Sequence, residues 1–412
     1  MSTPGTDRTF VIVGASLAGA KAAETLRAEG FGGRVVLVGE ETERPYERPP
    51  LSKGYLLGTE QREKVFVHDA GWYAEHAVDL RLGTRATAVD PAGREVELAG
   101  GERLRYDKLL LATGSVVRRL SVPGGDAEGV LYLRRLADSE RISAAVGSGE
   151  GRRVVVIGGG WIGLEVASAA RQRGAEVALV ELLDLPLERV LGTELAVVFA
   201  DLHRDHGVDL RLGTGVREIR EERGGRWAVV LDDAELPADA VVVGIGIAPA
   251  TALAEAAGLE VDNGVLVDAA LRTSDPDIYA AGDVANAFNP LLGERLRVEH
   301  WANALNGGPA AARSMLGQDV VYDRVPYFYS DQYDLGMEYS GYAPPGSYDQ
   351  VVYRGDVPGR EFVAFWLRDG RVLAGMNVNV WDVADAVQDL VRANRQVDTE
   401  RLADPDVPLP EV

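Results

Sequence analysis

The apolar positions of the first 320 residues alternate between short continuous runs and helical spacing. The runs at 9–13, 34–38 and 154–157 are almost wholly apolar, as in strands that are buried on both faces of a sheet. Apolar residues recur at helical spacing over 20–29 and 166–173, and a glycine follows each of these stretches. Strands that alternate with helices predict parallel sheets of the α/β class.

Three further strands run into glycine turns, at 109–114, 236–246 and 278–283. A further strand is expected at 176–181, directly after the helix over 166–173. The stretch from Arg44 to Ser52 is rich in proline and arginine and is expected to be irregular.

The pattern changes beyond residue 322, where short β-rich segments are separated by Gly, Pro and Asp. One helical stretch follows, and the proline-rich end at 405–412 is expected to be extended. This order predicts an antiparallel sheet with a helix. The expected strands are 327–329, 351–353, 362–367 and 372–376, and the expected helix is 383–394.

Two glycine-rich loops each follow a buried strand and open a helix. The first reads Gly14-Ala-Ser-Leu-Ala-Gly19 and the second Gly158-Gly-Gly-Trp-Ile-Gly163. Such loops bind pyrophosphate, because glycine allows close approach and the helix N-terminus offers unpaired amides. The first loop departs at Ser16, where the middle glycine is usual, although serine is also small. Two loops predict two dinucleotides, and the simplest use for two redox dinucleotides is electron transfer between them.

Each loop is followed by an acidic residue at the end of the next strand. Glu40 and Glu181 stand where a carboxylate takes the ribose 2′-hydroxyl. Glu181 would repel a 2′-phosphate, and Leu182 and Leu183 after it supply no arginine to receive one. The second loop is therefore expected to prefer NADH over NADPH.

The composition narrows the function further. The net charge of −21 argues against nucleic acid or anionic membrane as the main partner, and no apolar run approaches the roughly 20 residues that span a bilayer. The chain has no cysteine, so it carries no redox disulfide, thiolate nucleophile or cysteine-ligated cluster. His203 and His206 have helical spacing, but no third ligand stands out, so a solvated helix face is favoured over a metal site. No metal is expected.

The segment Arg44-Pro-Tyr-Glu-Arg-Pro-Pro-Leu-Ser-Lys53 resembles the NADH-dependent ferredoxin reductases of bacterial oxygenase and cytochrome P450 systems. The motifs at 112–114, 158–165, 281–283 and 299–303 resemble the same family and fall in its order, as does 328–332. The resemblance implies two nested dinucleotide-binding, Rossmann-like domains of glutathione-reductase type plus a C-terminal α+β domain. FAD would occupy the first unit and NADH the second.

The resemblance also implies site residues. Asp283 would bind the FAD ribityl chain, Arg134 its phosphates, the backbone at Ala86 its adenine, and Trp301 and its neighbours the flavin ring. Lys53 would sit near flavin N5, paired with Glu165, and these two are the expected catalytic residues. The full expected FAD set is Gly14, Ala15, Ser16, Gly19, Glu40, Arg48, Lys53, Ala86, Thr113, Gly114, Arg134, Gly282, Asp283, His300 and Trp301. The expected NAD set is Gly158, Gly160, Ile162, Gly163, Glu181 and Gly246.

The fate of the electrons separates the candidate functions. Disulfide reductases of similar architecture need a cysteine pair, which this chain lacks. Transfer to a ferredoxin is expected, with a P450 or dioxygenase beyond it. Proteins that resemble apoptosis-inducing factor, monodehydroascorbate reductase or rubredoxin reductase stay open as alternatives. Three arginines near the presumed flavin segments are candidates for a local basic dock: Arg295, Arg297 and Arg313.

We therefore expect a cytoplasmic enzyme, monomeric or weakly dimeric, in three parts. The FAD domain is expected at 1–114 and 243–321, the NADH domain at 115–242, and the C-terminal domain at 322–412.

Overall fold

The computed structural model describes residues 7–148 and 150–412. The chain divides into two compact units, each built from separate stretches of sequence. Unit 1 holds the residues up to Glu47, Arg62–Val116 and Ala248–Pro326. Unit 2 holds Arg48–Gln61, Val117–Ile247 and Tyr327–Val412. The chain passes between the units in segments that include β8 (Ser115–Val117) and β17 (Ile247–Pro249).

Unit 1 is built on a five-stranded parallel sheet in the order β19-β7-β1-β2-β3. Apart from β3 at one edge, its strands are almost wholly apolar, because their side chains are buried on both faces of the sheet. Parallel strands bring their carboxyl ends to one edge, and this places the first glycine loop, which follows β1, at that edge. The strands are β1 (Thr9–Val13), β2 (Arg34–Val38), β3 (Val78–Arg81), β7 (Lys108–Leu111) and β19 (Ile278–Ala280).

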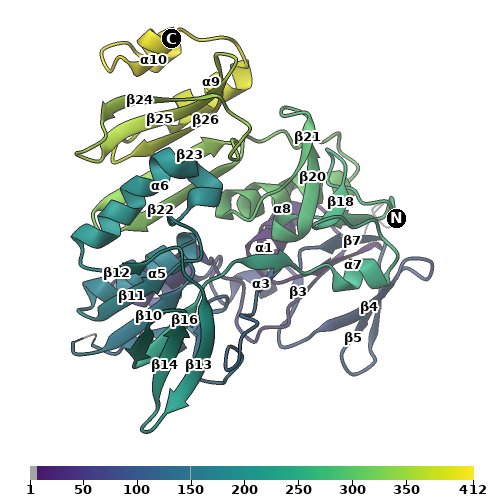
Figure 1. Ribbon diagram of the computed structural model, residues 1–412. Helices are drawn as coiled ribbons and strands as arrows, with labels where there is room; N and C mark the ends of the chain where they lie inside the picture. Colours follow the sequence, from purple (N-terminus) through teal and green to yellow (C-terminus); the bar gives the residue numbers. More distant parts are fainter. Residues whose placement is uncertain (1–6, 149) are drawn as a thin grey trace. The chain divides into compact units, whose positions relative to one another are not determined.

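Helix α1 (Leu17–Ala28) crosses α8 (Trp301–Met315) closely in unit 1 (Figure 1). A Cβ at Gly308 would overlap the carbonyl oxygen of Ala18, so this crossing depends on glycine. Alanine-rich α1 leaves room for the approach. The unit also contains α3 (Trp72–Glu75), α7 (Ala252–Ala256), and the 3₁₀ turns η2 (Arg62–Val65) and η3 (Gly282–Val284).

Two small sheets complete unit 1. One is antiparallel, and in the other β18 runs parallel to β20 while β21 returns antiparallel. The first comprises β4 (Ala86–Asp90), β5 (Glu95–Leu98) and β6 (Arg103–Arg105); the second comprises β18 (Val265–Val267), β20 (Ala285–Asn289) and β21 (Glu294–Arg297).

Unit 2 repeats the parallel plan in the order β12-β11-β10-β16-β9. The second glycine loop follows its central strand, as the first follows that of unit 1. The strands are β9 (Val130–Tyr132), β10 (Arg153–Ile157), β11 (Glu176–Val180), β12 (Asp209–Arg211) and β16 (Ala240–Val243). The helices are α4 (Leu136–Val146), α5 (Trp161–Gln172) and α6 (Glu188–Asp205).

Three expectations about the elements were wrong in part. The stretch 236–246 is not one strand: β15 (Glu235–Ala238) joins an antiparallel sheet with β13 (Val216–Glu222) and β14 (Arg226–Leu231), and only β16 joins the parallel sheet. The segment Arg44–Ser52 is not wholly irregular, because prolines at the first helical positions support a 3₁₀ turn, η1 (Pro49–Ser52), before α2 (Gly54–Leu57). The end at 405–412 is not simply extended: η4 (Leu409–Glu411) forms there, and Leu409 and Val412 are buried. Helix α10 (Thr399–Ala403) precedes this segment.

The last part of unit 2 is the expected antiparallel sheet, in the order β22-β23-β26-β25-β24. Helix α9 (Ala384–Ala393) contacts β23 and β26 and lies against this sheet (Figure 1). Its buried residues are Val387, Leu390 and Val391. The second strand of the sheet was not anticipated. The strands are β22 (Tyr327–Gln332), β23 (Leu335–Gly341), β24 (Gln350–Asp356), β25 (Glu361–Arg368) and β26 (Arg371–Val378).

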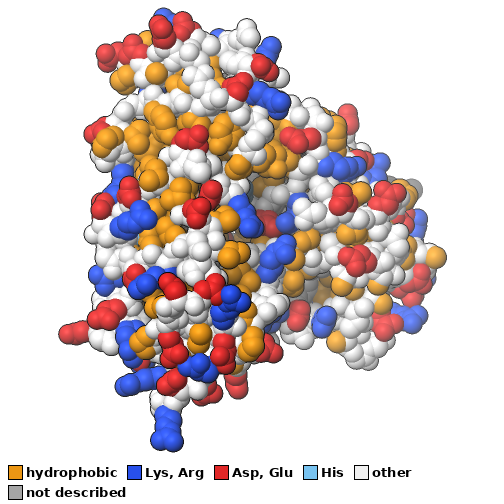
Figure 2. Space-filling view, viewed as in Figure 1, with side chains coloured by type: hydrophobic (Ala, Val, Ile, Leu, Met, Phe, Trp, Pro, Cys, Tyr) orange, Lys and Arg blue, Asp and Glu red, His pale blue; other side chains and the backbone are white. Residues whose placement is uncertain are grey.

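Acidic and basic side chains are interspersed on the face shown in Figure 2, despite the net charge of −21. Within 7–148 and 150–412, no helix combines the length and the apolar character needed to cross a membrane.

Candidate functional site

The first glycine loop is set by backbone contacts within unit 1. Gly14 has a φ of 122° and donates its amide to the carbonyl of Val38 at 2.8 Å. A Cβ there would overlap the carbonyl oxygen of Ala112, and a Cβ at Gly19 would overlap that of Gly14. Both glycines are therefore required by the fold at the point where helix and strand come closest.

Ser16 occupies the N-cap of α1 with φ −121° and ψ −162°, an extended conformation that any residue adopts. The departure from glycine therefore leaves the loop geometry intact. Its side chain makes no capping hydrogen bond in the structure. Ala15 precedes it, and the amides of the first helical turn point out of the N-terminus, as an anion site requires.

The second loop repeats this geometry in unit 2. Gly158 has a φ of 109°, and a Cβ there would overlap the carbonyl oxygen of Gly244. A Cβ at Gly163 would overlap the carbonyl of Gly158. The middle glycine differs: a Cβ at Gly160 would meet none of the described atoms within 4 Å. Gly160 thus leaves open space in front of α5 that the fold itself does not need, and this space suits a pyrophosphate.

Glu181 lies directly after β11 and is bound to the loop. Its Oε2 accepts from the amide of Gly159 at 2.6 Å and its Oε1 from that of Leu183 at 2.9 Å. Two backbone amides hold the carboxylate in place at the strand end, and each of its oxygens has a further lone pair. Leu182 is 66% exposed and Ile162 43%, so both offer apolar surface beside this loop.

The expected catalytic pair forms within unit 2. Nζ of Lys53, which follows η1, lies 2.8 Å from Oε1 of Glu165 on α5. Lys53 is 14% exposed and Glu165 only 3%. Two hydroxyls also donate to this carboxylate: Ser52 to Oε2, and Ser330 to Oε1 at 2.7 Å. A buried carboxylate needs such partners, because an unpaired buried charge is costly.

The roles of these two serines were not predicted from the sequence. The signal was present in β22, where Ser330 and Gln332 alternate with Tyr329 and Asp331 in an aromatic strand. Alternation places both polar residues on the buried face, and buried polar side chains require partners.

The remaining expected FAD residues are distributed over the two units. In unit 2, Arg48 donates to the carbonyl of Arg134, and the amide of Arg134 donates to Asp138 at 3.0 Å. In unit 1, Asp283 lies in η3 after Gly282, whose φ is 78°. Glu40 is exposed after the end of β2.

Trp301 opens α8 in unit 1, and its indole nitrogen donates to Glu47 at 3.0 Å. Burial lowers the pKa of the neighbouring His300 to about 4, against the opposing effect of Asp283, so its ring is neutral near pH 7. Thr113 donates to the carbonyl of Ala250 at 2.9 Å. The other expected positions are Gly114 with a φ of 68°, Gly246 with a φ of 96°, and Ala86, buried at the start of β4.

The expected solvated face at His203 was wrong. The residue is fully buried on α6, and its Nε2 lies 2.9 Å from Oε1 of Gln332 on β22. Burial lowers the pKa of His203 to about 4. His206 one turn on is half-buried and stacks on Tyr333 with 3.8 Å between ring centroids. The helical spacing was read correctly, but α6 turns His203 toward the C-terminal sheet.

The three candidate docking arginines all have partners within unit 1. Arg295 donates to the carbonyl of Val267 at 2.7 Å, Arg297 pairs with Glu299, and Arg313 pairs with Glu29 at 2.9 Å. A basic dock at these positions stays a prediction.

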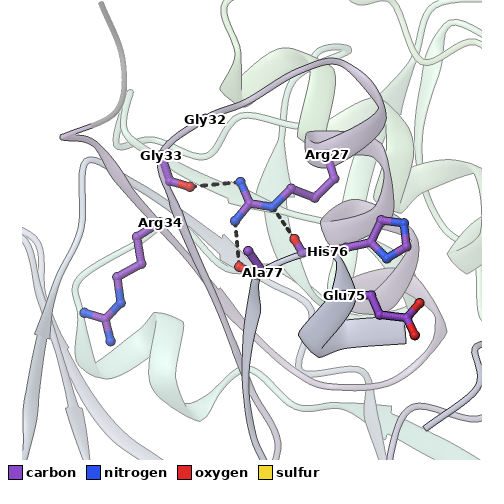
Figure 3. A pocket seen from close by; sticks show the side chains of 7 residues that line it. All are labelled: Arg27, Gly32, Gly33, Arg34, Glu75, His76 and Ala77. Carbon is purple, nitrogen blue, oxygen red and sulfur yellow. Dashed lines mark hydrogen bonds between the residues drawn. The ribbon is translucent and has the colours of Figure 1, made fainter. Parts of the chain in front are cut away.

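A pocket in unit 1 is a structural feature and not a ligand site. Figure 3 shows Arg27 of α1 donating to the carbonyls of Gly33, His76 and Ala77, and Phe31 accepts as well, all within 2.9 Å. The guanidinium thus fastens the end of α1 to the turn before β3, and its donors are used there. The lining residues are Arg27, Gly32, Gly33, Arg34, Glu75, His76 and Ala77.

Comparison with known families decides the class. Residues 8–308 match the family model described as pyridine nucleotide-disulphide oxidoreductase, and residues 327–412 match the one described as reductase C-terminal. The chain belongs to the pyridine nucleotide-disulphide oxidoreductase family. It is an oxidoreductase, and the fold class expected from the sequence is confirmed.

Individual relatives show which members of this family the chain resembles. The chain is 43% identical to the ferredoxin–NAD(+) reductase component of the anthranilate 1,2-dioxygenase system of Burkholderia cepacia, over 97% of this chain and 98% of the relative. It is 38% identical to putidaredoxin reductase of Pseudomonas putida, over 98% and 96%. A solved covalent complex of putidaredoxin reductase with putidaredoxin matches with a TM-score of 0.94 and 37% identity, covering 98% of each chain. The resemblance to ferredoxin reductases is confirmed.

One feature sets this member of the pyridine nucleotide-disulphide oxidoreductase family apart from the family's description. Its 412 residues contain no cysteine. A family member without cysteine cannot pass electrons through a disulfide of its own, so the electrons must leave by another route.

Proposed function

We propose that this protein is an NADH- and FAD-dependent ferredoxin reductase that serves an oxygenase or cytochrome P450. One observation carries the proposal: two glycine loops, each at the carboxyl edge of a parallel sheet, each followed by a carboxylate after the next strand. The near full-length relation to ferredoxin reductases supports it.

We assign FAD to the loop of unit 1 because its geometry fits a pyrophosphate. Gly14 and Gly19 bring the start of α1 against the strand, and Ser16 keeps the loop extended without obstructing it. Asp283, at the start of η3, would take the ribityl chain, and Trp301 would lie along the ring. The further FAD contacts are proposed for Ala15, Glu40, Arg48, Lys53, Ala86, Thr113, Gly114, Arg134, Gly282 and His300.

We assign NADH to the loop of unit 2. The space in front of Gly160 would admit the pyrophosphate, and Glu181 would accept from the ribose hydroxyls and repel a 2′-phosphate. Ile162 and Gly246 would line the rest of the site, with Gly158 and Gly163 shaping the turn.

Bound FAD would supply the chemistry that accepts two electrons as a hydride from NADH and releases them one at a time. The protein's part is orientation and electrostatics. We propose that Lys53 presents a fixed ammonium that stabilises negative charge on the reduced ring, and that Glu165 holds this half-buried lysine in place. The partner would be a ferredoxin with its own one-electron centre. A cytoplasmic location, where NADH is produced, fits this role.

The test is NADH-dependent reduction of cytochrome c by the purified, flavin-loaded protein, with and without ferredoxins. We expect the rate to depend on an added ferredoxin and to saturate with its concentration. Slow turnover with every ferredoxin, together with dimerisation on adding NADH, would instead favour a signalling flavoprotein.

A further inference from the structure

A chain of hydrogen bonds leads from the Lys53–Glu165 pair through the interior of unit 2. Ser330 donates to Glu165 at 2.7 Å, and Nε2 of Gln332 donates to the hydroxyl of Ser330 at 3.1 Å. Oε1 of Gln332 lies 2.9 Å from Nε2 of His203. Apart from Lys53, each of these side chains is at most 3% exposed. The chain joins three elements: α5, β22 and α6.

The direction of every bond follows from the carboxylate. A carboxylate only accepts, so Ser330 must donate to Glu165 and has only lone pairs left for Gln332. Gln332 therefore presents its amino group to Ser330 and its oxygen to His203. His203 must then carry its hydrogen on Nε2.

The far end of the chain agrees with this direction. Nδ1 of a neutral His203 is an acceptor, and the phenol of Tyr333 lies 3.4 Å from it as a donor. Burial keeps the ring neutral by lowering its pKa to about 4, with hydrogen bonding to Gln332 opposing and the charge of His206 adding to the shift. Every donor thus points toward Glu165, and aligned hydrogen bonds polarise one another.

The backbone strengthens the same junction. Ser168 lies one turn after Glu165 on α5, and its hydroxyl accepts from the amide of Tyr333 at 3.0 Å. Residues 165 and 168 of the helix thus meet residues 330 and 333 of the strand. Helix α5 starts at the second glycine loop, so β22 fixes the helix that carries both the loop and the carboxylate.

We propose that Ser330, Gln332 and His203 are positioning residues that orient the Glu165 carboxylate through this one-directional chain and so hold the ammonium of Lys53 in place. The inference rests on the proposed function for the part that Lys53 plays. It adds that the C-terminal sheet takes part in the redox chemistry through Ser330 and Gln332.

The first experiment is a double-mutant cycle read by anaerobic stopped-flow reduction of the bound flavin with NADH. We expect Ser330→Ala to lower the limiting rate about tenfold, because the carboxylate loses one charge-assisted hydrogen bond. Ser330→Thr keeps the hydroxyl and should recover most of the rate. Ser340→Ala is the matched control, since Ser340 is also buried in this sheet, and it should leave the rate unchanged.

The cycle separates positioning from a general structural effect. If Ser330 acts through the pair, Ser330→Ala should cause no further loss once Lys53→Ala is present. Additive losses, or a wild-type rate in Ser330→Ala while Lys53→Ala is slow, would overturn the inference and leave the proposed function standing. If Lys53→Ala itself reduces flavin normally, the role proposed for the pair fails and the inference fails with it.

The second experiment does not depend on activity. Long-range nitrogen–proton NMR of the full-length protein labelled at histidine distinguishes the two neutral tautomers, and the chain has only five histidines. His203→Asn would assign the resonance. We expect the Nε2–H tautomer at pH 7. An Nδ1–H tautomer, or a protonated ring at that pH, would contradict the direction of the chain even in protein that does not turn over.

Discussion

Two glutamates of unit 2 show how partners decide what a carboxylate does. Glu165 is surrounded by an ammonium and two hydroxyls in the interior, which agrees with the positioning role that we propose for it. Glu181 stands at a strand end, where two backbone amides hold it and its remaining lone pairs are open to a ligand. The surroundings of Glu165 therefore suit the positioning of Lys53, whereas those of Glu181 suit the binding of a ligand.

Glu181 gives the first prediction. Replacing Glu181 by Ala removes a charge that opposes a 2′-phosphate, so the preference for NADH over NADPH in kcat/KM should fall about tenfold. Steady-state rates with both reduced cofactors measure this. Glu176→Ala, at the other end of the same strand, is the control and should keep the preference. An unchanged ratio in Glu181→Ala would show that the carboxylate plays no part in the choice.

The lowered pKa of His203 predicts that the free energy of unfolding falls in acid. Its pKa is lowered from 6.5 to about 4 by burial, so the unfolded chain binds a proton more readily than the fold does between these values. Stability therefore falls as the pH drops from about 6.5 toward 4, by up to about 3 kcal/mol for this group. The half-buried His300, whose pKa is also lowered to about 4, adds to the effect.

Urea unfolding at pH 7.5 and pH 5.0 measures this dependence. His203→Gln cannot gain the proton, so its stability should fall less between the two pH values than that of the parent. His76→Gln, at an exposed position, should behave like the parent. Equal pH dependence in all three proteins would contradict a buried neutral His203.

At the scale of elements, the second loop separates two glycines that the fold needs from one that it does not need. Gly158 and Gly163 have no room for a side chain, whereas Gly160 does. The sequence could not separate these roles, because the three glycines look alike in a motif. It did predict the strand, loop and helix of each unit, since local apolar patterning specifies them.

Replacement by alanine should have opposite effects at Gly163 and Gly160. Gly163→Ala should lower the melting temperature by several degrees, because its Cβ would overlap the carbonyl of Gly158 at a cost of about 2 kcal/mol or more. Gly160→Ala should melt within about 2 °C of the parent. It should nevertheless weaken binding of NAD⁺, which cannot reduce the flavin, by about tenfold as measured by titration. Normal NAD⁺ binding in Gly160→Ala would mean that the open space is not used.

The contacts between elements were harder to predict than the elements. Lys53 and Glu165 are 112 positions apart in sequence, and only resemblance to a family suggested their pairing. Ser330 comes from a third segment, and a serine in an aromatic strand carries no motif. The alternation in β22 indicates that Ser330 is buried and needs a hydrogen-bond partner. The partner itself could not be identified, because the sequence does not show which helix covers that strand.

At the scale of the whole molecule, the absence of cysteine governs where electrons can go. Related folds that match this chain include a NAD-dependent persulfide reductase, with a TM-score of 0.86 and 26% identity. The same architecture thus serves sulfur chemistry elsewhere. With no cysteine in 412 residues, this chain must pass its electrons to an acceptor that brings its own redox centre.

This argument predicts indifference to thiol chemistry. Treatment with iodoacetamide should leave ferredoxin-dependent cytochrome c reduction by NADH unchanged, because no thiolate is present to alkylate. Small disulfides such as that of coenzyme A should oxidise NADH no faster than buffer does, since their reduction by a flavoprotein of this architecture needs a thiol relay. The ferredoxin must be treated separately and washed, so that its own cysteines do not confound the assay. Steady turnover of a small disulfide by the alkylated enzyme would show that the flavin reaches sulfur directly, and electron transfer to a ferredoxin would then no longer follow from the composition of the chain.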